Sequence, residues 1–356
     1  MPTRIIGLFS SGFISDKLGR KKCLIVSSIL QIASSCSAYF CSSFPALLTA
    51  VALSNLFSCM VQVPSYSLLS EICLITYRGH LASLNTFNSN CGWLLGLSLG
   101  LVVPVQYFYF SLCFPSLIFL VLCWRLPESP VWLMRKGNEK GARETLQWLR
   151  GDVYDVTPEI DELKDVINDE IVENEERSSW DILTTRSFLL PLVLTCSLFV
   201  FQANCGIDLT SYYISVIFKE SSVKPQQIAI LFQVTIKTLI FLANFMIQLL
   251  ITLGYLGSPL LLSRLDCKHI NMIFLTSIAL SMAGIGASFR FPGLLGPWVS
   301  IPCLVVAGAS YGLGVGPVSF VLMSSLFTQK NKSLGVAFAQ TTRQTAVLFQ
   351  VKVSFT

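Results

Sequence analysis

The chain is 356 residues long, 53% hydrophobic and only 13% charged, and its formal net charge is +5. Crossing the hydrocarbon core of a bilayer takes about 20 apolar residues per helix, and a helix satisfies its own backbone hydrogen bonds in lipid. The composition therefore predicts an all-α polytopic membrane protein. The alternating segments of about ten residues that are typical of membrane β-barrels are absent from the sequence.

The acidic residues are concentrated between Arg125 and Arg186, an interval that holds 15 of the 20 Asp and Glu residues together with 9 basic ones. The rest of the chain holds 16 basic and 5 acidic residues, and its basic residues lie in short breaks between apolar runs. This distribution follows the positive-inside rule rather than a nucleic-acid-binding pattern. The 12 Cys residues are scattered, so we expect buried packing residues, no structural disulfide and no metal site.

The first third of the chain predicts a half-length apolar segment followed by four full spans. The first run, Ile5 to Ile14, has no small-residue cleavage site after it, which argues against a signal peptide. The full-length runs cover about 24–44, 46–69, 81–103 and 106–124. The breaks at 16–22 and 71–80 are charged and those at 41–46 and 104–109 are not, so we expect the charged breaks to be cytoplasmic.

The central interval, residues 125–186, predicts two amphipathic helices, Glu139–Arg150 and Pro158–Glu176. Their apolar residues recur at spacings of three and four, with charge on the other faces. These residues are Leu146, Leu149, Ile160, Leu163, Val166 and Ile167. Two interpretations stay open: solvated helices beneath the membrane part, or an acidic surface that binds a partner.

The last part of the chain predicts a second set of spans, at about 187–205, 228–262, 270–289, 297–323 and 333–353. We therefore divide the chain into a first membrane bundle (1–124), a charged linker (125–186) and a second membrane bundle (187–356). The run at 228–262 is too long for one span, which indicates either a kink at Gly254–Pro259 or an insertion at 241–255. Asn331 begins a glycosylation sequon that this topology places in the cytoplasm.

The most specific short stretch reads Gly12-Phe-Ile-Ser-Asp16-Lys17-Leu-Gly19-Arg20-Lys21. The two glycines permit close helix approach and a tight turn. Asp16 can cap a helix start and pair with a cation on a neighbouring helix, and Arg20 and Lys21 are expected to anchor the turn at the anionic leaflet. The stretch resembles the loop between helices 2 and 3 of the major facilitator superfamily.

Two further stretches support this resemblance. Glu71 is followed seven residues later by Arg78-Gly79, which resembles the superfamily's loop between helices 4 and 5. The stretch Pro127-Glu128-Ser-Pro-Val-Trp-Leu133 resembles the segment after helix 6 in sugar porters and their organic-ion relatives. We expect Glu71, Arg78 and Glu128 to pair across helix ends and to bias the equilibrium between transport states without binding substrate.

The stretch Phe201-Gln202-Ala-Asn204-Cys-Gly206-Ile-Asp208, followed by Tyr212-Tyr213, is similar to the sugar-porter signature of helix 7. A Gln amide donates and accepts hydrogen bonds at once, as a sugar hydroxyl does. A helix break near Gly206 would free backbone groups, as in other transporters. The alternative is that Gln202 and Asn204 only pair with adjacent helices.

Asp208 is the only carboxylate that we place within a membrane span, where a charge must be paired, protonated or hydrated. It is either a proton-coupling site or the partner of a cationic side chain, or a water-exposed residue near the outer mouth that forms hydrogen bonds as its Asn counterpart would. Arg343 and Lys237 are candidate charge partners for it.

The segment that resembles helix 10 of the family contains Gly312-Leu-Gly-Val-Gly316-Pro317. Glycine and proline in this stretch predict a hinge at the transport cavity. The family's sugar-contacting Gln in helix 5 falls on Thr86, next to Asn85. Several positions depart from the sugar-porter pattern and put hexose recognition in doubt. These are Gly312 for Glu, Phe320 for Trp, Ser325 for Glu, Gln344 for Trp and Val347 for Asn.

The resemblance implies a major facilitator superfamily fold of two helical bundles and a sugar transporter in a plasma membrane, without a cofactor. Its expected substrate-binding residues are Gln202, Asn204, Asp208, Tyr212, Thr86 and Asn85, and its expected gating residues are Gly12, Asp16, Gly19, Arg20, Glu71, Arg78, Glu128, Gly316 and Pro317. The apolar, multi-Cys chain with its acidic middle is similar to facilitated trehalose transporters of insects. Transport is expected to be facilitated or proton-coupled.

Some alternatives to this reading stay open. The chain could be an organic-ion carrier of the same superfamily, a non-transporting membrane sensor, or an inactive fragment. When the motifs are aligned with those of the superfamily, the sequence begins within helix 2 and ends in helix 11. Helix 1, part of helix 2 and helix 12 are therefore expected to be missing from it. No nucleophile elbow, metal cluster or phosphate loop occurs in the sequence, so an enzyme is not expected.

Overall fold

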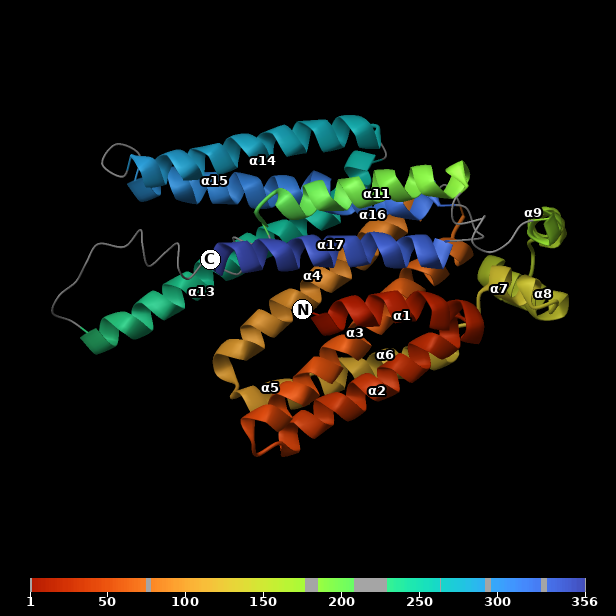
Figure 1. The fold of residues 1–356 in the computed structure, drawn as a ribbon, viewed down its shortest axis with the longest axis horizontal. Coiled ribbons are helices and arrows are strands. Elements are labelled where there is room, and N and C mark those ends of the chain that lie inside the picture. The colour runs from red at the N-terminus through yellow and green to blue at the C-terminus, as the bar shows by residue number, and fades with distance from the viewer. Residues whose placement is uncertain are drawn as a thin grey trace. The chain divides into compact units, whose positions relative to one another are not determined.

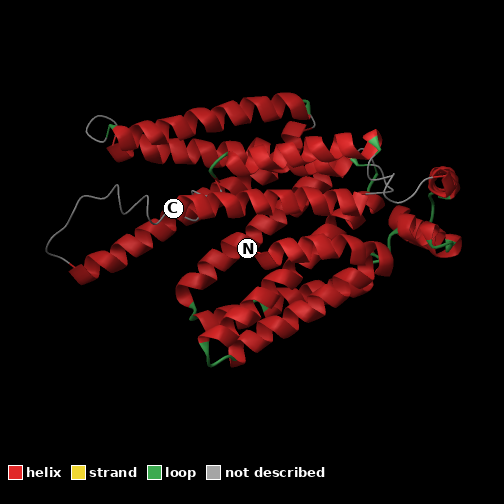
Figure 2. Cartoon of the chain, viewed as in Figure 1, coloured by secondary structure: helices red, strands yellow, loops and turns green. Residues whose placement is uncertain are grey.

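The computed structural model describes residues 2–74, 78–176, 185–207, 229–262, 264–291, 296–327 and 332–355, without the side chains of some residues at helix ends and of 229–244. The described residues form helices joined by turns and short loops (Figures 1 and 2). The expected all-α architecture is therefore confirmed for this part of the chain.

The helices follow the predicted runs closely, with ends that differ by a few residues. The first part of the chain contains α1 (Pro2–Leu18), α2 (Arg20–Phe40), α3 (Phe44–Ile72), α4 (Arg78–Val102), α5 (Val105–Ser111) and α6 (Cys113–Arg125). The linker contains α7 (Pro130–Arg135), α8 (Glu139–Arg150) and α9 (Thr157–Glu176). The last part contains α11 (Arg186–Asn204), α13 (Ala229–Leu262), α14 (Cys267–Arg290), α15 (Gly296–Ser310), the π-turn η2 (Tyr311–Val315), α16 (Gly316–Leu326) and α17 (Lys332–Phe355).

Six described helical segments are long and apolar enough to cross a membrane. Many of their large apolar side chains point outward, including Phe114, Trp124, Leu260 and Leu280. Large apolar side chains exposed on so many apolar helices suit contact with lipid. The chain is therefore a multi-pass membrane protein.

By residue contacts, the chain forms two compact units. Unit 1 comprises Met1–Arg78, Val103–Ser197 and Met323–Gln344, and unit 2 comprises Gly79–Val102, Leu198–Leu322 and Thr345–Thr356. These units are defined by contacts and not by chain order, so the three-part division of the sequence stays a prediction.

The linker helices of unit 1 have a small core of their own. Ala142, Leu146, Val156 and Ile160 are buried together, and Leu163 packs against them. The predicted apolar face is thus largely confirmed. Val166 is an exception because it is exposed; the buried face of α9 runs instead through Ile160 and Ile167.

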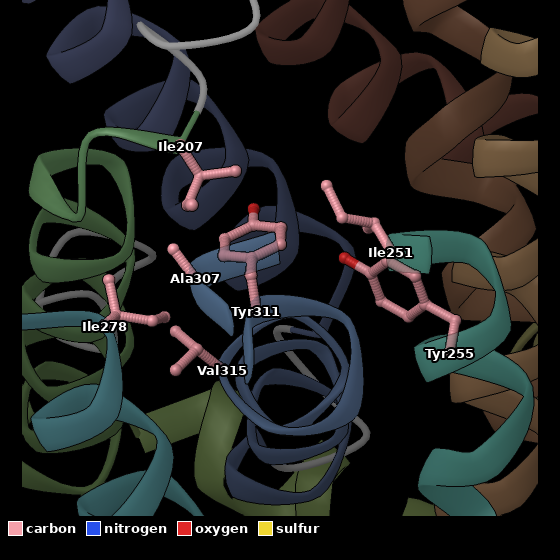
Figure 3. Close-up of a cluster of buried hydrophobic side chains, with 7 residues drawn as sticks. All are labelled: Ile207, Ile251, Tyr255, Ile278, Ala307, Tyr311 and Val315. Carbon is pink, nitrogen blue, oxygen red and sulfur yellow. The ribbon is translucent and has the colours of Figure 1, made fainter. Parts of the chain in front are cut away.

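The core of unit 2 is a cluster of seven residues, which we call the tyrosine cluster. Its members are Ile207, Ile251, Tyr255, Ile278, Ala307, Tyr311 and Val315 (Figure 3). Ile207 follows the end of α11, and the other six come from α13, α14, α15 and η2. The cluster thus ties together most of the helices of this unit.

The anomalous run at 228–262 forms one continuous helix, α13, of 34 residues. Pro259 lies inside it, and the helix continues past Gly254. Ile251 and Tyr255, from the segment suspected to be inserted, are both 2% exposed and belong to the tyrosine cluster. The segment 241–255 therefore lies within the helix, and its described residues form part of the core of unit 2.

Candidate functional site

Arg20 is the centre of a buried ion-pair network in unit 1. It is the first residue of α2, and its side chain is 1% exposed. The guanidinium nitrogens Nη2 and Nε lie 2.9 Å and 3.1 Å from the two carboxylate oxygens of Glu71 on α3. This two-point geometry is the strong form of an Arg–carboxylate pair, so it fixes the end of α3 against the start of α2.

The other donors of Arg20 are also engaged. Nη1 lies 3.2 Å from Oδ1 of Asp16, one turn earlier, and donates to the carbonyl of Ser15. Nη2 also donates to the hydroxyl of Ser333 at 3.3 Å, near the start of α17. A buried charge is tolerated only when paired and hydrogen-bonded in this way.

Glu128 completes the network by capping α2. Its Oε1 accepts hydrogen bonds from the backbone N–H groups of Arg20 and Lys21, at 2.9 Å and 3.0 Å. These N–H groups have no partner within the helix, and a carboxylate there suits the helix dipole. The N-cap, Gly19, has φ 96°, and a Cβ on it would lie 2.5 Å from Glu128 Oε2. Glycine is therefore required at this position.

Ser129 links the two carboxylates: its backbone N–H donates to Glu128 Oε1, and its hydroxyl donates to Glu71 Oε2. We call Asp16, Arg20, Glu71, Glu128, Ser129 and Ser333 the Arg20 cluster. It brings four of the predicted gating residues together in one place and adds Ser129 and Ser333, which the sequence analysis missed. Ser129 stands next to Glu128 in a singled-out motif, whereas nothing local in the sequence marks Ser333.

Two sequence interpretations of this turn are wrong. Arg20 is buried against Glu71, so it does not anchor the turn at lipid headgroups. The N-cap of α2 is Gly19, so Asp16 does not cap it; Asp16 does pair with a cation on the neighbouring helix, as predicted. Gly12 also fits its prediction, since a Cβ there would lie 3.0 Å from Ala337 Cβ on α17. The side chain of Arg78 lies outside the described part of the structure.

Gln202 is the centre of a neutral polar site in unit 2. It lies on α11, is 2% exposed, and donates through Nε2 to the Tyr311 hydroxyl at 3.2 Å. Its carbonyl Oε1 has no hydrogen-bond partner among the described residues. An unsatisfied buried acceptor costs about 1–3 kcal/mol, so a ligand hydroxyl at this position would find a ready partner.

The helix that carries Gln202 ends where the sequence predicts a break. α11 stops at Asn204, and Gly206 follows with φ 80°, a left-handed conformation that suits glycine. Ile207, directly after it, enters the tyrosine cluster. Asp208 and Tyr212 lie outside the described residues.

The predicted hinge of helix 10 coincides with an irregularity in the backbone. The turn η2, Tyr311–Val315, is a π-turn, and the N–H of Gly316 donates to the carbonyl of Tyr311. Such π-bulges frequently mark functional positions. Pro317 follows directly at the start of α16.

Helix α13 crosses η2 at very short range. A Cβ on Gly312 would lie 2.3 Å from the carbonyl oxygen of Ile251, and one on Gly254 would lie 2.7 Å from the backbone of Gly312. Small residues permit such close contacts between membrane helices. This packing gives a physical reason for the glycine at position 312.

Comparison with known proteins identifies the family of this chain. Residues 3–356 match the profile of a family described as "Sugar (and other) transporter". The chain belongs to this family.

Sugar transporters from several organisms are similar to this family member. It is 25% identical over 348 residues to "Sugar transporter ERD6-like 6" of Arabidopsis thaliana, covering 94% of this chain and 67% of the relative. It is 26% identical to "Facilitated trehalose transporter Tret1" of Polypedilum vanderplanki, covering 94% of this chain and 65% of the relative. A Tret1 of Apis mellifera ligustica is covered over only 50% of its length. The chain thus spans about one half to two thirds of these relatives.

Solved structures of the major facilitator superfamily have the same fold. The "proton:xylose symporter XylE bound to 6-bromo-6-deoxy-D-glucose" aligns with a TM-score of 0.81 at 20% identity, over 98% of this chain and 75% of that one. A partially occluded inward-open form of XylE from E. coli aligns at 0.74, with 19% identity and coverages of 98% and 77%. The predicted superfamily fold is therefore confirmed.

The other predicted sugar contacts of this family member lie in different settings. Asn204 is exposed; its Nδ2 donates to the Val200 carbonyl and its Oδ1 accepts from Gln350. Thr86 is buried on α4 and donates to the Ala82 carbonyl within its own helix. Asn85 is half-buried beside it.

A buried amide oxygen without a partner is not unique to Gln202. Among the described residues, Gln31 on α2, Asn271 on α14 and Gln340 on α17 also have one. Gln202 differs from these three because its unpartnered oxygen occurs together with the sugar-porter signature, a partner on the π-turn and a helix that ends two residues later. The structure therefore singles out Gln202 as the centre of the candidate site.

Proposed function

We propose that this protein transports a sugar, trehalose or a hexose, across a membrane by alternating access. The observation that carries the proposal is the buried Gln202 amide, which is held by Tyr311 and has a carbonyl without a partner among the described residues. A sugar hydroxyl can donate to that carbonyl, and the amide N–H keeps Gln202 oriented. The sugar transporters among the relatives support the same substrate class.

The proposed substrate-binding residues are those of the sequence analysis, with Gln202 at the centre. Asn204, Thr86 and Asn85 would contribute further polar groups, together with Asp208 and Tyr212. Asp208 is the proposed proton-coupling residue, if transport is coupled. Asp208→Asn should then abolish the dependence of uptake on external pH, and an unchanged dependence would reject coupling at this residue.

The Arg20 cluster is the proposed gate latch. Its hydrogen bonds require Glu71, Glu128 and Ser129 to lie close to the start of α2. A state in which these helix ends separate would lose the network, so the cluster would favour one state of the transport cycle. Gly12, Gly19, Arg78, Gly316 and Pro317 complete the proposed gating set.

We propose a plasma-membrane location with the linker, residues 125–186, in the cytoplasm. The cationic breaks support this orientation through the positive-inside rule. Glycosidase treatment followed by mass spectrometry tests it at Asn331. This site should carry no glycan, and a glycan there would reverse the assigned topology.

The test of function is uptake by proteoliposomes that contain the chain. Labelled trehalose and labelled glucose are offered separately, and a labelled quaternary ammonium ion represents the substrates of an organic-ion carrier. We expect saturable uptake of a sugar and none of the cation. Saturable uptake of the cation alone would favour the organic-ion carrier, and sugar binding without any uptake would favour a sensor or an inactive fragment.

A further inference from the structure

A second pair of amides lies in unit 2, and the sequence analysis did not single it out. Nε2 of Gln248 on α13 donates to Oδ1 of Asn90 on α4 at 2.8 Å. The two residues are 158 positions apart in the sequence. Hydrogen bonds of this kind between membrane helices contribute only about 0.6 kcal/mol on average, so stabilisation alone is a weak reason for two amides in apolar helices.

Gln248 lies on the face of α13 that packs into the core. The buried positions along this part of the helix are Gln248, Ile251, Tyr255 and Ser258, with Thr252 beside them, whereas Met246, Leu253, Leu256 and Leu260 are exposed. The spacing of three and four residues defines one helical face. Gln248 therefore points toward the same side as the tyrosine cluster and is 6% exposed.

Asn90 is connected to the same region from α4. Its Nδ2 donates to the carbonyl of Thr86, one turn earlier, and Thr86 is a predicted sugar contact. Phe87, three residues before Asn90, packs against the tyrosine cluster, and Ile247 next to Gln248 does the same. The amide pair thus borders the cluster whose Tyr311 accepts the Gln202 hydrogen bond.

The pair retains capacity for hydrogen bonding. An amide offers two N–H donors and one carbonyl oxygen. The described residues engage one N–H of each amide and the Asn90 oxygen, and they supply no partner for the Gln248 oxygen or for the second N–H of either amide. Two adjacent amides with donors and an acceptor to spare match two neighbouring hydroxyls of a sugar ring.

We infer that Asn90 and Gln248 are specificity-determining residues that bind a pair of neighbouring hydroxyls on the transported sugar. The inference rests on the proposed function, because it assumes that a sugar reaches the tyrosine cluster. It adds a contribution from α4 and α13 to that of Gln202. It also gives the segment 241–255 a role in recognition.

The test is equilibrium binding of labelled glucose or trehalose to the purified chain, competed by the monodeoxy derivatives of glucose. The variants are Gln248→Met and Asn90→Leu. Each replaces an amide with an apolar side chain of similar size. The unmodified protein should bind one or two of the deoxy sugars about five- to tenfold more weakly than glucose. These are the sugars that lack a hydroxyl bound by the amide pair, and the loss corresponds to one hydrogen bond of about 1 kcal/mol. Each variant should bind glucose and these deoxy sugars with equal affinity. The hydroxyl positions affected in the two variants should be the same or adjacent on the ring.

The matched control is Thr252→Val, on the same face of α13 and one turn beyond Gln248. Its hydroxyl donates to the Gln248 carbonyl within the helix, so the variant should leave the discrimination among deoxy sugars unchanged. A purely structural amide pair predicts that Gln248→Met weakens glucose and all deoxy sugars by one common factor. That result, or an unchanged pattern in both variants, would overturn the inference.

Binding separates this inference from the proposed function. Sugar binding without uptake would contradict transport and still test the two amides. The absence of binding by the unmodified, folded chain would overturn both proposals. A variant that does not fold is recognised because it shows no thermal unfolding transition. The other variant of the pair then tests the inference.

Discussion

The Arg20 cluster of unit 1 and the Gln202 site of unit 2 solve the problem of buried polarity in opposite ways. The Arg20 cluster is charged, and its guanidinium and carboxylates pair with one another. The Gln202 site is neutral and leaves an amide oxygen without a partner among the described residues. A closed network suits a residue set that holds helices in one arrangement, whereas unused hydrogen-bonding capacity suits a set that receives a ligand.

The largest effect should come from breaking the charged network. Arg20→Gln leaves Glu71 buried without its cation, a change that typically costs about 3–5 kcal/mol. We expect a large drop in the thermal unfolding temperature of the purified chain. Lys22→Gln, an exposed cation in the same turn, is the control and should change it little. Equal effects of the two variants would show that Arg20 has no special role in stability.

A somewhat smaller effect is expected where α13 crosses η2 in unit 2. Gly312→Ala brings a Cβ to 2.3 Å from the Ile251 carbonyl oxygen, and overpacking of this kind costs about 1–3 kcal/mol. The control is Gly286→Ala on α14, where nothing lies within 4 Å of the added Cβ. It should be neutral or slightly stabilising. If Gly312→Ala unfolds at the same temperature as Gly286→Ala, the claim that α13 and η2 cross too closely to admit a Cβ at position 312 would be contradicted.

Removing the central amide of the neutral site should change binding more than stability. Gln202→Met deletes the hydrogen bond to Tyr311 but also deletes the unpartnered oxygen, so the two effects on folding largely offset each other. Sugar affinity should fall about fivefold or more, the value of at least one lost hydrogen bond. Equilibrium binding of labelled sugar measures this.

Gln31→Met in unit 1 is the matched control for that change. Gln31 also combines a donated hydrogen bond, to Ser54 at 2.9 Å, with a carbonyl that lacks a partner among the described residues. Its substitution should leave sugar affinity unchanged. If both Gln variants lost affinity equally, an unpartnered amide would not distinguish a binding site from a structural position.

The smallest effect concerns the linker and depends on pH. Asp155 accepts hydrogen bonds from the hydroxyl and backbone N–H of Thr157, which lower the pKa of Asp155 below its ordinary value of about 3.9. The ionised group therefore stabilises the fold above that value, and the contribution is lost as pH falls through the lowered pKa. At neutral pH, Asp155→Asn should unfold at a slightly lower temperature than the unmodified chain, and this difference should shrink as the pH falls through the lowered pKa of Asp155. Asp152→Asn, which alters another exposed residue of the same loop, is the control and should unfold at the same temperature as the unmodified chain at neutral pH.

Periodicity and apolar run length were sufficient to predict the helices. The linker helix Glu139–Arg150 was predicted to the residue, and the break after Asn204 follows from the glycine at position 206. The long helix α13 was harder, because hydropathy records length but not whether a segment packs as one helix. Ile251, Tyr255 and Gly254, from the segment in question, make tertiary contacts within unit 2 that hydropathy does not record.

The sites were predictable only where their residues belong to local motifs. Arg20, Glu71 and Glu128 each stand in a recognisable stretch, yet the sequence did not show that Arg20 is the partner of Glu71, 51 positions away. Ser333 joins Arg20 across 313 positions, and Asn90 joins Gln248 across 158. Such pairs are created by the fold, so no local spacing in the sequence could reveal them.

The most direct test of this account measures sugar binding and sugar uptake side by side for Arg20→Lys and Gln202→Met. Arg20→Lys keeps the positive charge but loses the two-point pairing with Glu71. We predict that Arg20→Lys binds sugar nearly as well as the unmodified chain but transports it more slowly, whereas Gln202→Met loses binding and uptake together. A parallel loss of binding in both variants, or none in Gln202→Met, would contradict the division between latch and binding site.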